Sequence, residues 1–200
     1  MHRGLADFIT SRVRVKILEL FYADPEQLYY IREVTRKVDE EINAVRRELN
    51  SMVGRGILKT ENRGNRAYFY VNKAYTYFPE LQQMVLKSGK LATQMRRLHH
   101  KLGKVEFVMF SNQFINRRQE KVKELDILVV GDIVIPELEV LIKEEEKKLG
   151  REINYMVLNG GEFRMRKQRR DGFITEALYG KKVMVIGDEE EFVDRSIKTP

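Results

Sequence analysis

Cysteine is absent from the chain, and its absence excludes two kinds of chemistry. Without thiols the protein can form neither disulfide bonds nor thiolate metal sites. The three histidines, His2, His99 and His100, lack the spacing of a zinc site, so we expect no metal and no other cofactor. A chain without cysteine suits a reducing compartment, and we expect it to be cytoplasmic.

Long apolar runs are missing as well. No stretch approaches about 18 uncharged apolar residues, so we expect no transmembrane helix and no membrane partner. The opening residues, MHRGLADF, do not lead into the apolar segment that a secretory signal requires. The 200 residues are 42% hydrophobic and 34% charged. This composition is typical of a globular chain, and the length allows two modest domains, each with its own core.

Positive charge is in excess, because 37 Lys and Arg stand against 30 Asp and Glu and give a formal net charge of +7. Such an excess favours a polyanionic partner, although total charge alone is a weak signal. Its distribution is more informative. Lys and Arg are dense over 12–73, 87–104 and 164–170, whereas acidic runs lie at Glu144–Glu146 and Asp188–Glu191.

Three helices are predicted in the first third of the chain. Apolar residues recur at helical spacing in RVRVKILELFYA (12–23), and a second, short helix is expected at IREVTRKV (31–38). Asp39 offers a cap for a third helix through EEINAVRRELNSMVGRG (40–56). The two glycines at the end of that segment should stop the helix.

The third predicted helix has two different faces. Apolar residues recur at three- and four-residue steps, so one face should pack inward. The opposite face carries the side chains Asn43, Arg46, Arg47 and Asn50. An α-helix fits the major groove of DNA, where Arg pairs with guanine and Asn with adenine. A single one of these residues is best explained as part of a solvated helix face, but the four together with the hairpin that follows favour DNA binding.

A β-hairpin is predicted next, from ILKTEN (57–62) and RAYFYVN (66–72). The two runs are joined around Gly64 and an asparagine, residue types that tolerate positive φ in a tight turn. Arg63 and Arg66 flank this turn. We predict that they contact DNA phosphates or enter the minor groove.

The order of these elements over residues 8–73 resembles a winged helix-turn-helix domain. The segment INAVRREL, followed by GIL, is similar to the recognition helix and strand entry of ArsR-like regulators. The resemblance implies a DNA-binding domain over residues 1–74 whose partner is duplex DNA. Such readers commonly use paired half-sites, so we expect a homodimer. The helices expected over 75–103 form a linker that serves dimerisation or docks the second domain.

Two apolar runs in the C-terminal half predict strands. KVEFVMF (104–110) is followed by Ser111, and LDILVVG (125–131) opens directly after Glu124. The second run is almost entirely apolar, as expected of a central strand covered on both faces. This layout resembles the polymerase-beta-type nucleotidyltransferases, which have Gly-Ser at the first place and Asp-x-Asp at the second. The resemblance implies that residues 104–200 form a small α/β nucleotidyltransferase-like domain with a mixed sheet, and that the whole chain is α+β.

The residues that would perform nucleotidyl transfer are largely replaced. Phe110 takes the glycine position and would crowd the approach of a triphosphate to the backbone. Glu124 replaces the first aspartate, Asp126 matches the second, and the third carboxylate falls at about Asn154. Transfer needs two metal ions, and asparagine is a poor ligand for them. We therefore expect no enzyme activity, with Ser111, Glu124 and Asp126 as remnants of a catalytic site, or with Asp126 as a structural hydrogen-bond acceptor.

The sequence thus predicts a transcription regulator with an inactive nucleotidyltransferase-like domain, which serves dimerisation, binding of a partner protein, or sensing of a nucleotide. One alternative is an active nucleotidyltransferase, antitoxin-like, that adenylylates a protein and uses the winged helix as an adaptor. Another is a module that uses the winged helix for protein contacts. The run Arg164–Arg170 is basic, and a solvated face is its default interpretation, with contact to phosphates as the alternative.

Overall fold

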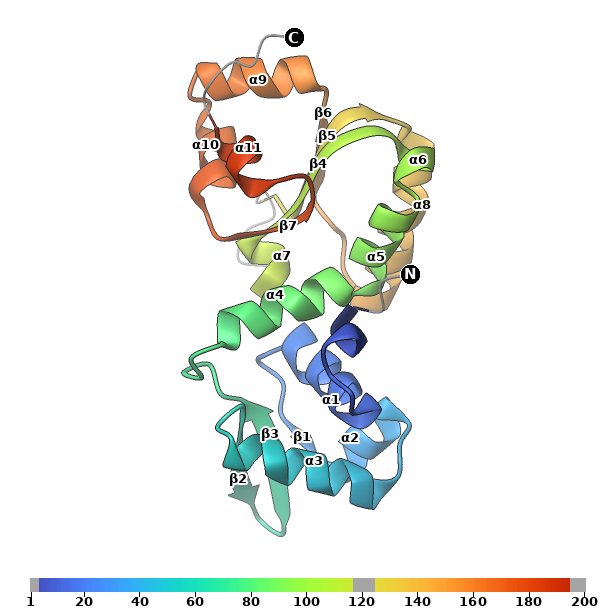
Figure 1. The fold of residues 1–200 in the computed structure, drawn as a ribbon, viewed down its shortest axis with the longest axis vertical. Coiled ribbons are helices and arrows are strands. Elements are labelled where there is room, and N and C mark those ends of the chain that lie inside the picture. Colours follow the sequence, from blue (N-terminus) through green and yellow to red (C-terminus); the bar gives the residue numbers. More distant parts are fainter. Residues whose placement is uncertain (1–3, 117–124, 195–200) are drawn as a thin grey trace. The chain divides into compact units, whose positions relative to one another are not determined.

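The computed structural model of the chain describes residues 4–116 and 125–194. Helices and two separate sheets, of three and four strands, make up the fold, which confirms the predicted α+β class. The chain divides into two compact units, Met1–Gly89 and Lys90–Pro200. Each unit has its own sheet (Figure 1). Each also has its own buried core.

The first unit contains, in chain order, η1 (Gly4–Asp7), α1 (Arg12–Ala23), β1 (Tyr29–Tyr30), α2 (Ile31–Val38), α3 (Ile42–Gly54), β2 (Leu58–Arg63), β3 (Arg66–Val71) and α4 (Phe78–Ser88). Helices α1, α2 and α3 pack against one another, and α4 packs against α1 and η1. The buried side chains at their centre include Ile17, Phe21, Val34, Val45, Leu49 and Met52. The helical spacing of these apolar residues explains why each helix turns one face to the core.

The hairpin lies where the sequence predicts it. Strands β2 and β3 are antiparallel with Arg63 opposite Arg66, which leaves a two-residue turn. The first turn residue, Gly64, has a φ of +56°, in the left-handed region that a side chain makes costly. Strand β1 pairs with the other edge of β3, so the order is β1-β3-β2.

The start of the third helix differs from the prediction. Asp39 is not its cap: the residue ends α2 and has a φ of +51°, which aspartate tolerates better than most residues. The cap is Glu41, whose carboxylate accepts hydrogen bonds from the backbone N–H groups of Asn43 and Ala44, both at 2.8 Å. These two bonds also lower the pKa of Glu41. The predicted beginning of the helix was therefore wrong by two residues.

The second unit contains α5 (Lys90–Arg97), α6 (His99–Leu102), β4 (Gly103–Ser111), α7 (Asn112–Asn116), β5 (Ile127–Ile133), α8 (Ile135–Leu149), β6 (Tyr155–Leu158), α9 (Gly160–Gln168), α10 (Gly172–Tyr179), β7 (Lys182–Ile186) and α11 (Glu189–Val193). The strand order is β6-β5-β4-β7. Strand β4 is antiparallel to both of its neighbours, and β5 is parallel to β6. The sheet is therefore mixed.

Strand β5 is an interior strand of this sheet, as its apolar sequence indicates. Leu128 and Val130 belong to a core shared with α9, α10 and α11. On the other side of the sheet, α5, α6 and α8 pack together (Figure 1). Among the helices in the described part of the chain, none is both long and apolar enough to cross a membrane.

The helices expected as a linker are shared between the two units. Phe78 and Leu81 of α4 pack against the core of the first unit, in which Val85 is buried. Leu91 and Met95 of α5 are buried in the second unit. The apolar faces on which the expectation of dimerisation rested are thus already covered within each unit.

Candidate functional site

The four residues predicted to contact DNA from the third helix lie on one exposed face of α3. Asn43, Arg46, Arg47 and Asn50 are all exposed, whereas Val45, Leu49 and Met52 on the opposite face are buried. Within the exposed face, Arg46 Nη1 donates a hydrogen bond to Asn43 Oδ1 at 3.2 Å. The structure therefore brings together the four side chains that the sequence selected.

A brace from α1 holds α3 from behind. Glu48 of α3 accepts hydrogen bonds from Ser11 Oγ at 2.6 Å and from Arg14 Nε at 2.8 Å. The Glu48 side chain is 17% exposed, so water screens these charge-assisted bonds less than those of a surface pair. The orientation of α3 is thereby tied to α1.

A second clamp holds the turn between α2 and α3. Lys16 Nζ donates to the backbone oxygen of Val38 at 2.8 Å and forms an ion pair with Glu40 at 2.6 Å. Arg12 binds the same carboxylate at 2.7 Å. Hydrogen bonds from Lys16 and then Arg12 lower the pKa of Glu40. Arg12, Arg14 and Lys16, three of the cations that make the sequence basic near residue 12, are therefore engaged in ion pairs within the first unit.

The two arginines predicted at the hairpin rest on tyrosine rings. The Arg66 guanidinium carbon lies 4.9 Å from the ring centre of Tyr30, and that of Arg63 lies 5.7 Å from the ring centre of Tyr68. Arg63 also pairs with Glu61. Both arginines are exposed. Such cation–π contacts are worth about 0.5–1 kcal/mol at exposed sites and restrict where each guanidinium points.

The positions predicted to be remnants of a catalytic site meet at one edge of the sheet of the second unit. Ser111 ends β4, Asp126 precedes β5 and Asn154 precedes β6. The backbone N–H of Ser111 donates to the oxygen of Asp126 at 2.9 Å, and that of Asp126 donates to the oxygen of Asn154 at 2.8 Å. Glu124, the fourth expected position, lies outside the described residues.

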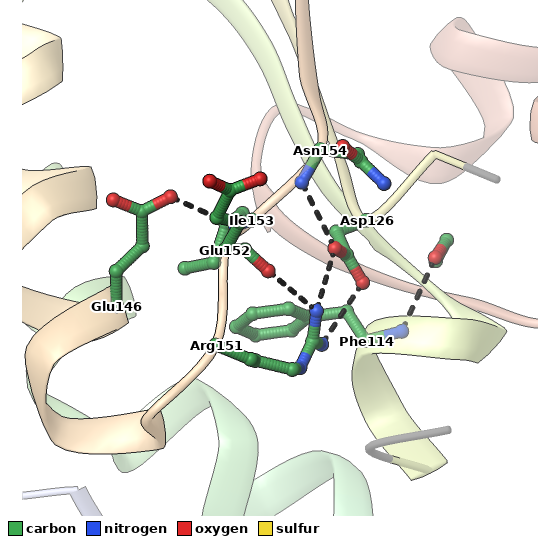
Figure 2. Close-up of polar contacts among 8 residues, drawn as sticks. Phe114, Asp126, Glu146, Arg151, Glu152, Ile153 and Asn154 are labelled. Atoms are coloured by element: carbon green, nitrogen blue, oxygen red, sulfur yellow. Dashed lines mark hydrogen bonds and ion pairs between the residues drawn. The ribbon is translucent and has the colours of Figure 1, made fainter. Parts of the chain in front are cut away.

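Asp126 is fully buried and is held by an arginine (Figure 2). Arg151 Nη1 and Nη2 donate to its two carboxylate oxygens at 2.8 and 3.0 Å, and the backbone N–H of Asn154 adds a third bond at 3.0 Å. The guanidinium lies over the ring of Phe114, with a carbon-to-centre distance of 5.9 Å. The Arg151 side chain is itself only 12% exposed. This bidentate pair makes Asp126 a structural acceptor of hydrogen bonds.

The surroundings of Ser111 are those of a local turn. Its hydroxyl accepts a hydrogen bond from the backbone N–H of Phe114 at 3.3 Å, which supports the first turn of α7. Phe110, at the position expected to be glycine, is buried with its ring centre 4.7 Å from that of Phe114. Two phenylalanine rings thus pack where the turn follows β4.

Metal ligands do not gather in the residues that the structure describes. Within 4–116 and 125–194, no three His, Cys, Asp or Glu side chains are placed to hold a metal ion. His99 and His100 are exposed, and the Nδ1 of His99 lies 2.9 Å from the backbone oxygen of Arg96. His99 therefore takes part in the local structure of a helix end.

Arg151 and Glu48 are the important residues that sequence reasoning missed. Arg151 follows the glycine that ends α8, and Asp126 lies 25 positions earlier. Glu48 lies 34 positions from Arg14. Both pairs join separate elements, so no local spacing indicates them.

No protein-family model and no curated protein matches the chain. Among solved structures, human N-acetylserotonin methyltransferase in complex with SAM matches with 15% sequence identity and a TM-score of 0.29. The match covers 88% of this chain and 46% of the methyltransferase chain, so this chain spans about half the length of that protein. A likeness with so low a TM-score carries no argument about fold or activity.

Proposed function

We propose that the protein is a sequence-specific DNA-binding regulator of transcription. Its first unit is a winged helix-turn-helix domain, with α3 as the recognition helix and the β2–β3 hairpin as the wing. The observation that carries the proposal is the exposed face of α3, on which Asn43, Arg46, Arg47 and Asn50 stand side by side. These residue types match the hydrogen-bonding edges of adenine and guanine in the major groove.

The braces behind α3 support this proposal. A helix that reads base edges must be held in a fixed orientation, because hydrogen bonds to bases depend on direction. The bonds from Ser11 and Arg14 to Glu48 supply such a hold. Arg63 and Arg66 of the wing, each placed by a tyrosine ring, suit contacts to phosphates or the minor groove.

The second unit is proposed to be a nucleotidyltransferase-like domain without transferase activity. Its mixed sheet, with antiparallel β4 and β5 and parallel β5 and β6, is compatible with that resemblance. The carboxylate of Asp126 accepts three hydrogen bonds and already faces the positive charge of Arg151. A divalent cation would have to displace this guanidinium. The unit would then serve dimerisation, a partner protein or a nucleotide ligand.

The absence of transfer is tested directly with radiolabelled nucleoside triphosphates. The native chain and Asp126→Ala are incubated with Mg²⁺ or Mn²⁺, alone and with cell extract. No label should enter protein or nucleic acid in either sample. Label that the native chain incorporates and the variant does not would establish an enzyme, and the first unit would become its targeting module.

A homodimer remains part of the proposal, since paired half-sites suit this class of reader. Because the apolar faces of α4 and α5 are covered, the pairing would use other exposed apolar side chains, such as Val134, Ile135 and Val140. Light scattering should give twice the mass of the 23.7 kDa chain. A single-chain mass at every concentration, with a single half-site protected on DNA, would reject the dimer.

DNA binding is tested by the affinity for a duplex as salt is varied. The logarithm of the association constant should fall linearly with the logarithm of salt, by about 0.9 for each phosphate contacted. Arg63→Ala should weaken binding to all duplexes and lower this slope by about one. Arg97→Ala, an exposed arginine of α5, is the matched control and should behave like the native chain. Binding that ignores salt, or none at low salt, would refute the proposal.

A further inference from the structure

The corner between α9 and α10 carries five cations over residues 164–170, and they are not equivalent. Arg166 donates to Glu162 Oε1 at 2.7 and 3.0 Å and lies 3.8 Å from a carboxylate oxygen of Asp171. Lys167 Nζ donates to the backbone oxygen of Phe192 at 2.8 Å. These two cations hold the corner together, and Arg166 is matched with both carboxylates of this segment.

The other three cations face outward. Arg169 and Arg170 are exposed, and neither has an ion pair or side-chain hydrogen bond within the described residues. Arg164 is also exposed and has a single long contact, 3.4 Å, to Glu106. Arg164, Arg169 and Arg170 are referred to below as the α9 arginine surface. Met165, 42% exposed, lies between them on the helix.

Helix α8 shows how a merely solvated charged face is built in this same unit. There Lys143 pairs with Glu139, and Lys148 pairs with Glu145, at 3.4 and 3.2 Å along the helix. Glu144 pairs with Lys90 at 2.9 Å. Lysines and glutamates pair along α8, and all of its cations are lysines. Within the described residues, Arg169 and Arg170 of the α9 arginine surface have no such partner, and Arg164 has only its contact with Glu106. The guanidinium fork fits phosphate oxygens better than a lysine ammonium does.

Arg170 also adopts a backbone conformation that is unfavourable for arginine. Its φ is +53°, at the position after a helix where glycine is usual. The bond from the N–H of Asp171 to the oxygen of Arg166, at 3.1 Å, closes the helix end in the way that normally selects glycine. Cations near the last carbonyls are already present in Arg166, Lys167 and Arg169, so the helix dipole does not require one at 170.

We propose that the α9 arginine surface binds the phosphate backbone of nucleic acid. A strained position that keeps an arginine without an internal partner indicates a role outside the fold. Met165 is a single exposed apolar side chain among these arginines. A surface with one apolar side chain suits a phosphate backbone better than a lipid bilayer, which would take several. The contacts carry no sequence preference, since they reach phosphates alone. The proposal does not depend on DNA reading by the first unit.

The test uses the full chain with Arg46→Ala and Arg47→Ala as background, which removes the proposed base readers. Fluorescence anisotropy follows its binding to a labelled 20-base-pair duplex of arbitrary sequence at several salt concentrations. In this background, adding Arg164→Ala, Arg169→Ala and Arg170→Gly should lower the salt slope by about two to three. Adding Arg97→Ala and Lys147→Ala, two exposed cations of α5 and α8, should leave it unchanged.

Each outcome decides the matter. Equal slopes for the arginine variant and its control, or no duplex binding at all in the background, would overturn the proposal. Binding of the background to vesicles of anionic lipid, with none to the duplex, would overturn it in favour of a membrane. Failure of the first unit to select any DNA sequence would refute the proposed function but would not contradict the proposal for the α9 arginine surface.

Arg170→Gly alone separates binding from folding. Glycine relieves the left-handed strain, so the melting temperature should be equal to or higher than that of the native chain. Duplex affinity should fall in the same variant. A lower melting temperature with unchanged affinity would mean that Arg170 serves the fold, and the proposal would be wrong.

Discussion

The exposed face of α3 and the cluster around Asp126 both gather polar side chains, but they use them in opposite ways. On α3, four Asn and Arg side chains are exposed, and the bonds that fix the helix lie behind it, at Glu48. In the cluster, Asp126 is fully buried and both of its oxygens are bound by Arg151. A surface that leaves hydrogen-bonding capacity toward solvent can bind a ligand, whereas a buried carboxylate whose two oxygens are already bound has little capacity left for one.

The largest effect is expected on stability, when the ion pair between Asp126 and Arg151 is broken. Arg151→Ala removes the partner of a fully buried carboxylate and should reduce the free energy of unfolding by about 3–5 kcal/mol. Urea unfolding measures this change, with Arg97→Ala as the control. In the double variant Asp126→Asn/Arg151→Met no buried charge remains, so much of the loss should be recovered. If Arg151→Ala unfolded within 1 kcal/mol of the control, the pair would not hold the site.

A smaller effect is expected on DNA binding, when a side chain on the exposed face of α3 is truncated. Arg47→Ala should leave stability unchanged, because the side chain is exposed. Its binding to a preferred duplex should weaken by about 1–3 kcal/mol, with relaxed preference at one base position. Anisotropy against duplexes that vary at each position measures both. A variant with uniform weakening at all positions would place Arg47 on a phosphate instead.

Weakening the bonds that Glu48 forms with α1 should lower both stability and sequence preference. Glu48→Gln weakens the charge-assisted bonds from Ser11 and Arg14 and should cost about 1 kcal/mol of stability, roughly the difference between a hydrogen bond to a charged group and one to a neutral group. Sequence preference should fall with it, because α3 loses its fixed direction. Unfolding and duplex discrimination are measured on the same samples. Retained discrimination in a destabilised variant would show that the brace does not position α3.

The smallest effect is expected on the stability of the protein at low pH. Hydrogen bonds from Lys16 and Arg12 lower the pKa of Glu40 below its ordinary value of 4.5. A carboxyl whose folded-state pKa is lowered contributes stability above its unfolded pKa, and this contribution is lost as pH falls through the folded pKa. Stability should therefore decline below about pH 4.5, and the decline should be less steep in Glu40→Gln. Identical pH profiles for the two proteins would contradict the role of this clamp.

The exposed face of α3 was largely predictable from the sequence, and the contacts of the cluster around Asp126 were not. Helical periodicity is local, so the spacing of Asn43, Arg46, Arg47 and Asn50 was enough to place them on one face of α3. The same reasoning put the helix start at Asp39, because it could not show that Glu41 turns its own carboxylate back onto the first N–H groups.

The partner of Asp126 depends on how distant elements meet. Arg151 reaches Asp126 only because β6, which follows it, lies parallel to β5. From the sequence we expected a carboxylate without catalytic partners, yet no feature of the sequence indicated that Arg151 binds it. The outward direction of Arg169 and Arg170 likewise depended on which carboxylates Arg166 had already engaged.

The measurement that tests the central claim most directly is genome-wide recovery of the DNA bound by the native chain and by Arg47→Ala. The account predicts a shared sequence motif among fragments bound by the native chain. In the variant, the motif should persist with one position relaxed. Recovery of fragments without any common motif, or an identical motif for both proteins, would contradict the reading of DNA by the exposed face of α3.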